Sequence, residues 1–234
     1  MKARAVILSY KAAPELIKYI RDLEIEVIFS TKSKTDERIA DHPDLQLNPI
    51  DDKTYMVAPE LLGYYQDNLI GYGVKLIEGQ TELASIYPKD CPYNVARVGN
   101  FFISMEQAID SELRKELEGR GLKGIFQKQA YAKCMTIEFD DFAITCDKSI
   151  EKALKNLGIE VYYISPEVIK LDGFDIGFLG GSCGIIDNKK VLFTGDLSQL
   201  KDFNILKRIF DGKGIEIIYP TCDLVDLGSI IPIY

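Results

Sequence analysis

The chain has 234 residues, of which 47% are hydrophobic and 27% charged, which is enough for one sizeable core and too apolar for a disordered chain. Its 28 basic and 36 acidic side chains give a net charge of −8, which argues against broad binding to nucleic acid or anionic lipid. No apolar run approaches the roughly 18 residues of a membrane span, and the N-terminus resembles a first strand rather than a signal peptide. We therefore expect a single domain, 1–234, with no membrane partner.

Cysteine and histidine usage limits the metal chemistry of the chain. The five cysteines are Cys91, Cys134, Cys146, Cys183 and Cys222. They form no CxxC pair, and His42 is the only histidine, so we expect no metal site and no other cofactor. Thiols in a chain without an export signal are most simply reduced, which predicts a cytoplasmic location.

One pattern recurs five times along the chain: an apolar strand, a helix and a second apolar strand that is usually introduced by glycine. In chain order the expected strand pairs are 5–9 and 25–29, 55–58 and 73–77, 101–104 and 121–126, 142–146 and 158–162, and 191–195 and 214–218. The helix of the fourth unit has apolar residues at helical spacing from Ile150 to Leu157, with Asp147 as its N-cap and Gly158 just beyond its end. The predicted units span about 4–30, 44–79, 94–128, 134–165 and 177–220.

Units two to five carry an additional strand before the first one. In the fourth unit the apolar residues 135–139 precede the polar turn 140–141, and in the fifth unit 184–186 precede 187–188. A short polar turn between two apolar runs is typical of an antiparallel hairpin. The first unit lacks this strand, and we expect the C-terminal segment 222–231 to supply it and thereby close a ring.

Five strand–strand–helix–strand units in a ring predict an α/β fold, specifically a five-bladed α/β-propeller of ββαβ units closed by the C-terminal strand. The alternative is a doubly wound α/β sheet with a phosphate ligand, because that fold also alternates strands and helices. The hairpins argue against this alternative, and no G-x-G-x-x-G sequence follows any strand.

Residues 180–184, GGSCG, fit the G-x-S-x-G sequence of a hydrolase nucleophile elbow. That motif requires a helix directly after the serine, whereas a hairpin is predicted after Ser182. His42 also precedes the serine, the reverse of the hydrolase order. We therefore reject the elbow and expect the glycines to allow close backbone packing near the centre of the ring.

His42 and Cys134 occupy corresponding places ahead of the second and fourth units. The acidic neighbours Asp41 and Asp44 can orient the imidazole, although a lone histidine is commonly a surface or capping residue. Two lysines, at positions 128 and 133, could lower the pKa of the Cys134 thiol, although a buried cysteine is commonly an inert core residue.

Other groups stand at comparable places in the repeat. Cys183 and Cys222 occupy comparable positions in units five and one, so the sequence leaves open which thiol is reactive. Asp223 and Asp226 follow Cys222 on the predicted closing strand. They either end that strand in solvent or form a carboxylate pair that faces a cationic ligand.

These features together resemble the pentein superfamily, the guanidino-group-modifying enzyme fold of arginine deiminases, dimethylarginine hydrolases and amidinotransferases. The resemblance rests on the fivefold repeat, on the H-x-D sequence at 42–44 and on the C-M-T sequence at 134–136. The stretches 42–45, 131–134, 177–181 and 226–232 further resemble a group of small, uncharacterised bacterial proteins with that fold.

The resemblance implies a cysteine-dependent hydrolase or transferase, of the amidinohydrolase or deiminase type, that acts on a small cationic guanidino or related C–N compound. It implies that Cys134 attacks the guanidinium carbon to form a covalent thiouronium, and that His42 protonates the leaving amine and then activates water. Asp44 together with Asp226, or with Asp223, would hold the guanidinium through charge-assisted hydrogen bonds.

Two features depart from the pentein enzymes. Their cysteine lies in the last unit, whereas Cys134 lies in the fourth, which implies a circular permutation. A lysine at position 133 would repel a guanidinium by about 1 to 4 kcal/mol if it faced the same pocket. The competing hypothesis is therefore a non-catalytic protein that binds a small molecule or a partner on the same fold, and the sequence leaves a homo-oligomer open.

Overall fold

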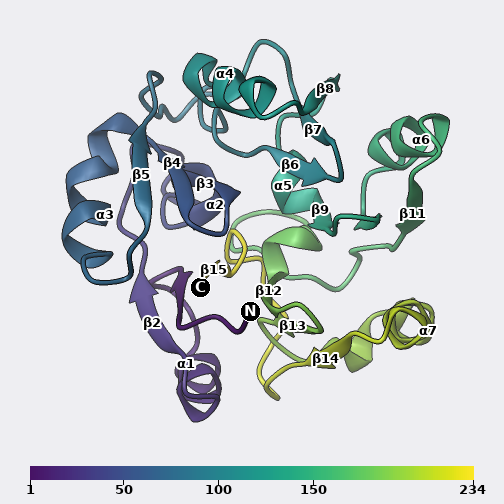
Figure 1. Cartoon of the computed structure of the whole chain (residues 1–234). Helices are drawn as coiled ribbons and strands as arrows, with labels where there is room; N and C mark the ends of the chain where they lie inside the picture. The colour runs from purple at the N-terminus through teal and green to yellow at the C-terminus, as the bar shows by residue number, and fades with distance from the viewer.

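In the computed structural model, which describes residues 1–234, the chain forms five three-stranded sheets arranged around a common centre (Figure 1). In every sheet the middle strand pairs antiparallel with one neighbour and parallel with the strand that follows the helix. Five separate sheets of this kind contradict the doubly wound alternative, which requires one open, mostly parallel sheet.

The first three sheets contain the N-terminal half of the chain and its last strand. Sheet one contains β1 (Ala5–Leu8), β2 (Glu26–Phe29) and β15 (Ile231–Ile233), with helix α1 (Pro14–Asp22). Sheet two contains β3 (Leu47–Asp51), β4 (Thr54–Val57) and β5 (Lys75–Glu78), with η1 (Pro59–Leu61) and α3 (Leu62–Asn68). Sheet three contains β6 (Ala96–Val98), β7 (Phe101–Ser104) and β8 (Lys123–Phe126), with α4 (Ser111–Gly119).

The remaining sheets follow the same plan. Sheet four contains β9 (Thr136–Glu138), β10 (Phe142–Thr145) and β11 (Glu160–Tyr163), with α6 (Lys148–Asn156). Sheet five contains β12 (Cys183–Asp187), β13 (Lys190–Phe193) and β14 (Glu216–Ile218), with η3 (Leu197–Gln199) and α7 (Phe203–Lys213). Short helical turns precede the first strands of three sheets: α2 (Pro43–Gln46), α5 (Ala132–Met135) and η2 (Gly180–Ser182).

Local sequence explains where the helices begin and end. The Asp147 side chain accepts hydrogen bonds from the backbone N–H groups of Ser149 (2.7 Å) and Ile150 (2.9 Å), which caps α6. Gly158 takes a φ of +75°, the left-handed conformation that ends a helix at little steric cost. The predicted helix of the fourth unit is confirmed, and it buries Ile150 against the sheets.

Neighbouring sheets share their apolar cores. The largest buried cluster includes Ile7 of β1, Tyr55 of β4 and Phe102 of β7, so it joins sheets one, two and three. A second cluster joins Ile144 of β10 to Phe193 of β13. Because each sheet buries its apolar faces against its neighbours, the ends of the middle strands are held in fixed positions relative to one another.

The C-terminal segment completes sheet one, but its strand is shorter and later than predicted. The expected strand covered 222–231, whereas β15 begins at Ile231 and pairs with β1 through Ile231–Ile7 and Ile233–Ala5. Gly228 and Ser229 take positive φ values of 70° and 68°, which a strand cannot accommodate. The residues ahead of β15 therefore form an irregular segment, and this segment carries Asp226 toward the centre.

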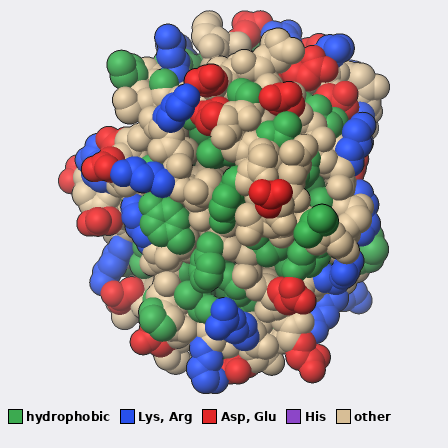
Figure 2. Space-filling model, turned by 90° about the vertical axis from the view of Figure 1, so that its left-hand side faces the viewer, with side chains coloured by type: hydrophobic (Ala, Val, Ile, Leu, Met, Phe, Trp, Pro, Cys, Tyr) green, Lys and Arg blue, Asp and Glu red, His purple; other side chains and the backbone are tan.

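On the face shown in Figure 2, charged side chains of both signs surround a central area where hydrophobic side chains gather, and no histidine reaches the surface there. His42 is in fact 4% exposed. None of the helices combines the length and the apolar character needed to cross a membrane.

Candidate functional site

The segments that lead into the first strands of the sheets contact one another and bring the predicted site residues together. His42 and Asp44 lie at α2, Cys134 lies in α5, and Asp226 lies in the segment before β15. All four side chains are buried, with exposed fractions of at most 4%. His42, Cys134 and Asp226 line one pocket of about 160 Å³, although they come from three different sheets.

Cys134 is held by two polar neighbours. Its Sγ donates a hydrogen bond to Asp44 Oδ2 at 3.0 Å and accepts one from Asn94 Nδ2 at 3.0 Å. Asn94 Oδ1 in turn accepts from the backbone N–H groups of Lys133 (2.9 Å) and Cys134 (3.2 Å). Asn94 therefore fixes both the thiol and the helical turn that carries it.

Sequence reasoning missed Asn94, although the repeat contains a signal for it. Asn94 stands two residues before β6, and Cys134 stands two residues before β9. Ser229 has the same offset from β15, and its hydroxyl donates to Asp44 Oδ2 at 2.7 Å. Equivalent positions in the repeated unit thus supply three groups of the same site.

The environment of Cys134 keeps its thiol protonated. Burial raises the pKa of Cys134 well above its ordinary value, and the carboxylates of Asp44 and Asp226 raise it further. The prediction that lysines lower this pKa is wrong, because no lysine lines the pocket. Lys133 lines a different cavity, where its Nζ lies 3.0 Å from Glu138 Oε1, so it does not face a ligand beside Cys134.

His42 lies beside the buried carboxyl of Asp226, with Nδ1 3.9 Å from Oδ1. That carboxyl accepts hydrogen bonds from the backbone N–H groups of Phe178 (2.9 Å) and Gly228 (3.0 Å). Burial raises the pKa of Asp226 to about 6, although His42 opposes the shift. Asp226 can therefore change its charge near neutral pH beside the imidazole.

Asp44 has one carboxylate oxygen in use and one free. Its Oδ2 accepts from Cys134 and Ser229, whereas the buried Oδ1 has no hydrogen-bond partner. A buried carboxylate oxygen without a donor is unfavourable, so it is a ready acceptor for a donor group of a ligand.

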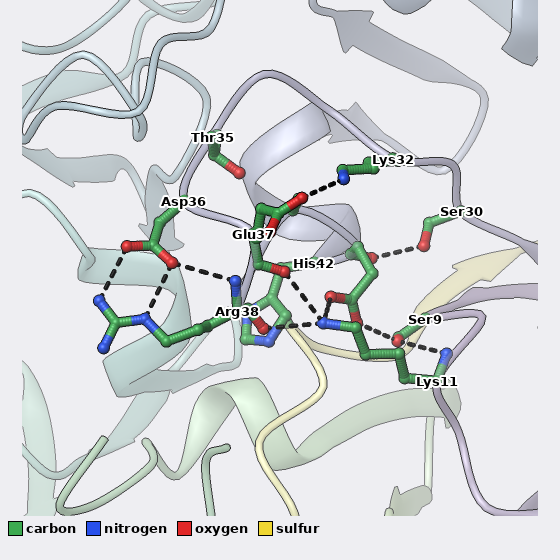
Figure 3. A network of polar contacts seen from close by, with 12 residues as sticks. Ser9, Lys11, Ser30, Lys32, Thr35, Asp36, Glu37, Arg38 and His42 are labelled. Carbon is green, nitrogen blue, oxygen red and sulfur yellow. Dashed lines mark hydrogen bonds and ion pairs between the residues drawn. The ribbon is translucent and has the colours of Figure 1, made fainter. Parts of the chain in front are cut away.

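A polar network fixes the segment that leads to His42 (Figure 3). The Asp41 carboxylate accepts a hydrogen bond from the Ser9 hydroxyl and pairs with Lys11 Nζ at 2.6 Å. The Ser30 hydroxyl donates to the Asp41 carbonyl at 2.5 Å, and the backbone N–H of His42 donates to Ile39 O at 3.0 Å. These contacts tie the turn to sheet one and thereby fix where the imidazole enters the pocket.

Two glycines allow the site segments to approach closely. A Cβ at Gly181 would lie 2.0 Å from Asp226 Oδ1, and a Cβ at Gly228 would lie 2.2 Å from His42 Cβ. The predicted role of the glycines around 180–184 is thus confirmed. The rejection of the nucleophile elbow is also confirmed, because strand β12 and no helix follows Ser182.

Several residues named in the sequence analysis do not line the pocket, and Asp44 is among them, although it contacts Cys134 on the lining. The side chain of Asp223 is 69% exposed and pairs with Lys170 Nζ at 2.7 Å. Cys183 lines the larger cavity, and Cys222 donates to Thr194 O at 3.3 Å. Asp226 is therefore the carboxyl that the C-terminal segment contributes, and Cys134 is the only cysteine on the lining of the His42 pocket.

A third buried carboxyl lies behind Tyr131, which lines the pocket. Asp90 is 3% exposed and accepts hydrogen bonds from the Tyr131 hydroxyl and, at 3.0 Å, from Cys91 Sγ. No lysine or arginine pairs with it, and no group of three or more His, Cys, Asp and Glu side chains is arranged to hold a metal ion. Buried carboxyl groups therefore lie on and behind the pocket lining, which itself contains no lysine or arginine.

Several solved structures are similar to this chain over most of its length. The DDAH of Pseudomonas aeruginosa, a mutant complexed with citrulline, shares 14% identity with a TM-score of 0.55, over 94% of this chain and 93% of its own. SxtG, an amidinotransferase from Microseira wollei, shares 10% identity with a TM-score of 0.57, over 100% and 95%. Agmatine deiminase from C. jejuni shares 11% identity with a TM-score of 0.55, over 94% and 88%. These likenesses show that the chain has the pentein fold.

Sequence comparison is less informative about activity. A family of unknown function (DUF6873) has a model that matches residues 7–231. No curated protein matches the sequence. The chemistry must therefore be argued from the pocket itself.

Proposed function

The chain belongs to the DUF6873 family of unknown function, and we propose that it is a cysteine-dependent hydrolase or transferase acting on a guanidino or related C–N compound. The observation that carries this proposal is that His42 and Cys134 line the same pocket. We also infer that the five sheets form a closed five-bladed propeller, which is supported by the pairing of β15 with β1.

The charge of the pocket supports a cationic substrate. Asp44, Asp90 and Asp226 are buried in or beside it, and no lysine or arginine lines it. Buried carboxylates without cationic partners are costly, so a planar cation with several N–H donors would offset their charge and satisfy their oxygens. The free Oδ1 of Asp44 is one such oxygen.

The same charge couples substrate binding to activation of the thiol. In the free protein the carboxylates help to raise the pKa of Cys134. A bound guanidinium neutralises that field and favours the thiolate, whose proton passes to His42. The thiolate then adds to the guanidinium carbon, and His42 returns the proton to the departing amine, which leaves a covalent thiouronium.

Hydrolysis or transfer completes the cycle. His42 takes a proton from water, the resulting hydroxide adds to the thiouronium carbon, and the carbon–sulfur bond breaks to release a ureido product and the thiolate. The net reaction consumes one water and one guanidinium and yields a urea and an ammonium or alkylammonium ion. An amine that enters in place of water would give amidino transfer.

Turnover of guanidines by the wild type and by Cys134→Ala tests the proposal. Arginine, agmatine, methylarginines and n-butylguanidine form the first substrate panel, and mass spectrometry of quenched reactions detects the covalent adduct on the peptide that contains Cys134. Loss of both turnover and adduct is expected, while Cys222→Ala, a thiol outside the pocket, retains both. Equal turnover by Cys134→Ala would overturn the proposal.

A non-catalytic binding protein on the same fold is the second candidate. The observation in its favour is the raised pKa of Cys134, which keeps the thiol protonated in the free protein. A cationic guanidine that stabilises the protein against heat without any product over hours would support this function. Detection of a covalent adduct would exclude it.

A further inference from the structure

The outer wall of the His42–Cys134 pocket has a different chemistry from its base. One segment, 164–179, which links β11 to η2 and is called the outer segment here, supplies most of the wall. Its pocket-lining side chains are Leu171, Phe174, Ile176 and Phe178, and they are joined by Ile39 and Leu45. Gln129 contributes the one side-chain amide on the lining.

Two cations beside the outer segment are already paired with other groups. Arg38 lies with its guanidinium 4.0 Å from the centroid of the Phe174 ring, and it donates to Gly173 O at 2.7 Å. Its Nε and Nη2 donate to Asp36 at 2.9 and 2.8 Å, and Figure 3 shows the same pairing. Lys170 is likewise paired with Asp223 at 2.7 Å.

Arg38 also holds the outer segment in place. It reaches across from the segment that leads to His42, and a Cβ at Gly173 would lie only 2.4 Å from Arg38 Cδ. The ring of Phe174 therefore lies between the pocket and a guanidinium that already pairs with Asp36 and Gly173 O. These contacts favour the position of the apolar wall seen in the structure.

A ligand whose cation lies against Asp226, the carboxyl on the pocket lining, would extend its substituent along this wall. An α-amino acid substituent carries a carboxylate and an ammonium, and burial of either without a partner is strongly unfavourable. An alkyl or aryl substituent gains from the same burial. We propose that the pocket selects guanidinium or amidinium cations with an apolar, uncharged substituent and rejects those with an amino-acid or ammonium tail, an inference that rests on the proposed function for its cationic head.

Four ligands test this inference by calorimetry on Cys134→Ala, which prevents turnover. n-Butylguanidine and agmatine have the same four-carbon chain, and only agmatine carries a terminal ammonium. L-Arginine carries a zwitterionic end, and n-butylurea lacks the cation. We expect n-butylguanidine to bind about 100-fold more tightly than agmatine or L-arginine, because a site rejects an unpaired polar group strongly.

Variants of the outer segment give a second, independent readout. Leu171→Arg places a cation on the wall and is expected to raise the ratio of L-arginine affinity to n-butylguanidine affinity at least tenfold. Val168→Arg is the matched control, because it adds the same charge to the same segment at a residue that is 38% exposed and does not line the pocket. We expect no change of the ratio in this control.

The outcomes separate this inference from the proposed function. Agmatine or L-arginine binding as tightly as n-butylguanidine would overturn the selection for apolar substituents, while turnover and adduct formation at Cys134 would still decide the enzymatic proposal. If n-butylurea binds as tightly as n-butylguanidine, the requirement for a cationic group is overturned. Binding of none of the four ligands would overturn the inference as a whole.

Discussion

Two cavities meet at the same helical turn, α5, and differ in almost every property. Cys134 lines a pocket of about 160 Å³, whereas its neighbour Lys133 lines one of about 540 Å³. The larger cavity has charges of both signs, and there Lys133 pairs with Glu138 at 3.0 Å. The smaller pocket has one carboxyl, that of Asp226, and no lysine or arginine on its lining.

This difference shows that volume alone does not identify a reactive site. In the larger cavity the charges are matched, so the ion pair outweighs the effect of burial and raises the pKa of Lys133. In the smaller pocket the charges are unmatched, and burial raises the pKa of Asp226 to about 6. Unmatched buried charge beside a cysteine thiol is a stronger indication of chemistry than an open space.

His42→Ala should have the largest effect on the smaller pocket. Loss of the group that moves the proton is expected to lower kcat about 10²- to 10⁴-fold, because general acid–base catalysis contributes on that scale. Binding of n-butylguanidine to the variant should change by only a few-fold, which separates chemistry from binding. Steady-state kinetics and calorimetry measure the two quantities, and an unchanged kcat would contradict the role of His42.

Asp44→Asn should change binding and thiol reactivity in opposite directions. The cation loses a buried carboxylate, so its affinity is expected to fall about 10- to 100-fold. The same change removes a charge that raises the pKa of Cys134, so alkylation of the thiol by iodoacetamide at pH 8 should become faster. Asp223→Asn, which alters an exposed carboxylate, serves as the control. A slower alkylation in Asp44→Asn would contradict this account.

Binding of the cation should depend on pH through Asp226. Its pKa of about 6 means that the carboxyl is charged above pH 6 and neutral below it. Affinity for n-butylguanidine is therefore expected to be highest above pH 6 and to fall, by at most about tenfold per pH unit, as the pH decreases below it. Calorimetry between pH 5 and 8 measures the curve, and Asp226→Asn should flatten it.

The double variant Lys133→Met, Glu138→Gln should have the smallest effect. It neutralises the ion pair in the larger cavity without leaving one charge unpaired, and turnover should stay within about twofold of the wild type. A large loss of turnover would mean that the two cavities are functionally linked. In that case the contrast between the two cavities would not identify the smaller pocket as the functional site.

The order of strands and helices could be predicted from the sequence because local signals specify each repeated unit. Hairpin turns, the Asp147 cap and Gly158 act within a few residues of their own position, and the structure confirms them. The meeting of His42 and Cys134 in one pocket followed from their equivalent places in the repeat and from the resemblance that the repeat supported.

What the sequence could not supply was the direction of side chains in irregular or very short elements. Lys133 and Cys134 are adjacent, yet a single helical turn directs them into different cavities. Asp223 and Asp226 also point in different directions. The positive φ values after Asp226 mean that side chains in this segment do not alternate between two faces as they do in a strand. The outer segment has no periodicity, so its apolar wall appears only once its packing against Arg38 is known.

The pairing of β15 with β1 has a consequence for biosynthesis. His42 and Cys134 are synthesised well before Asp226. Strand β1 has no antiparallel neighbour until Ile231–Ile233 have emerged from the ribosome. The middle sheets can therefore form early in synthesis, whereas the first sheet is completed, and the carboxyl of Asp226 joins the pocket, only after this late segment has been made.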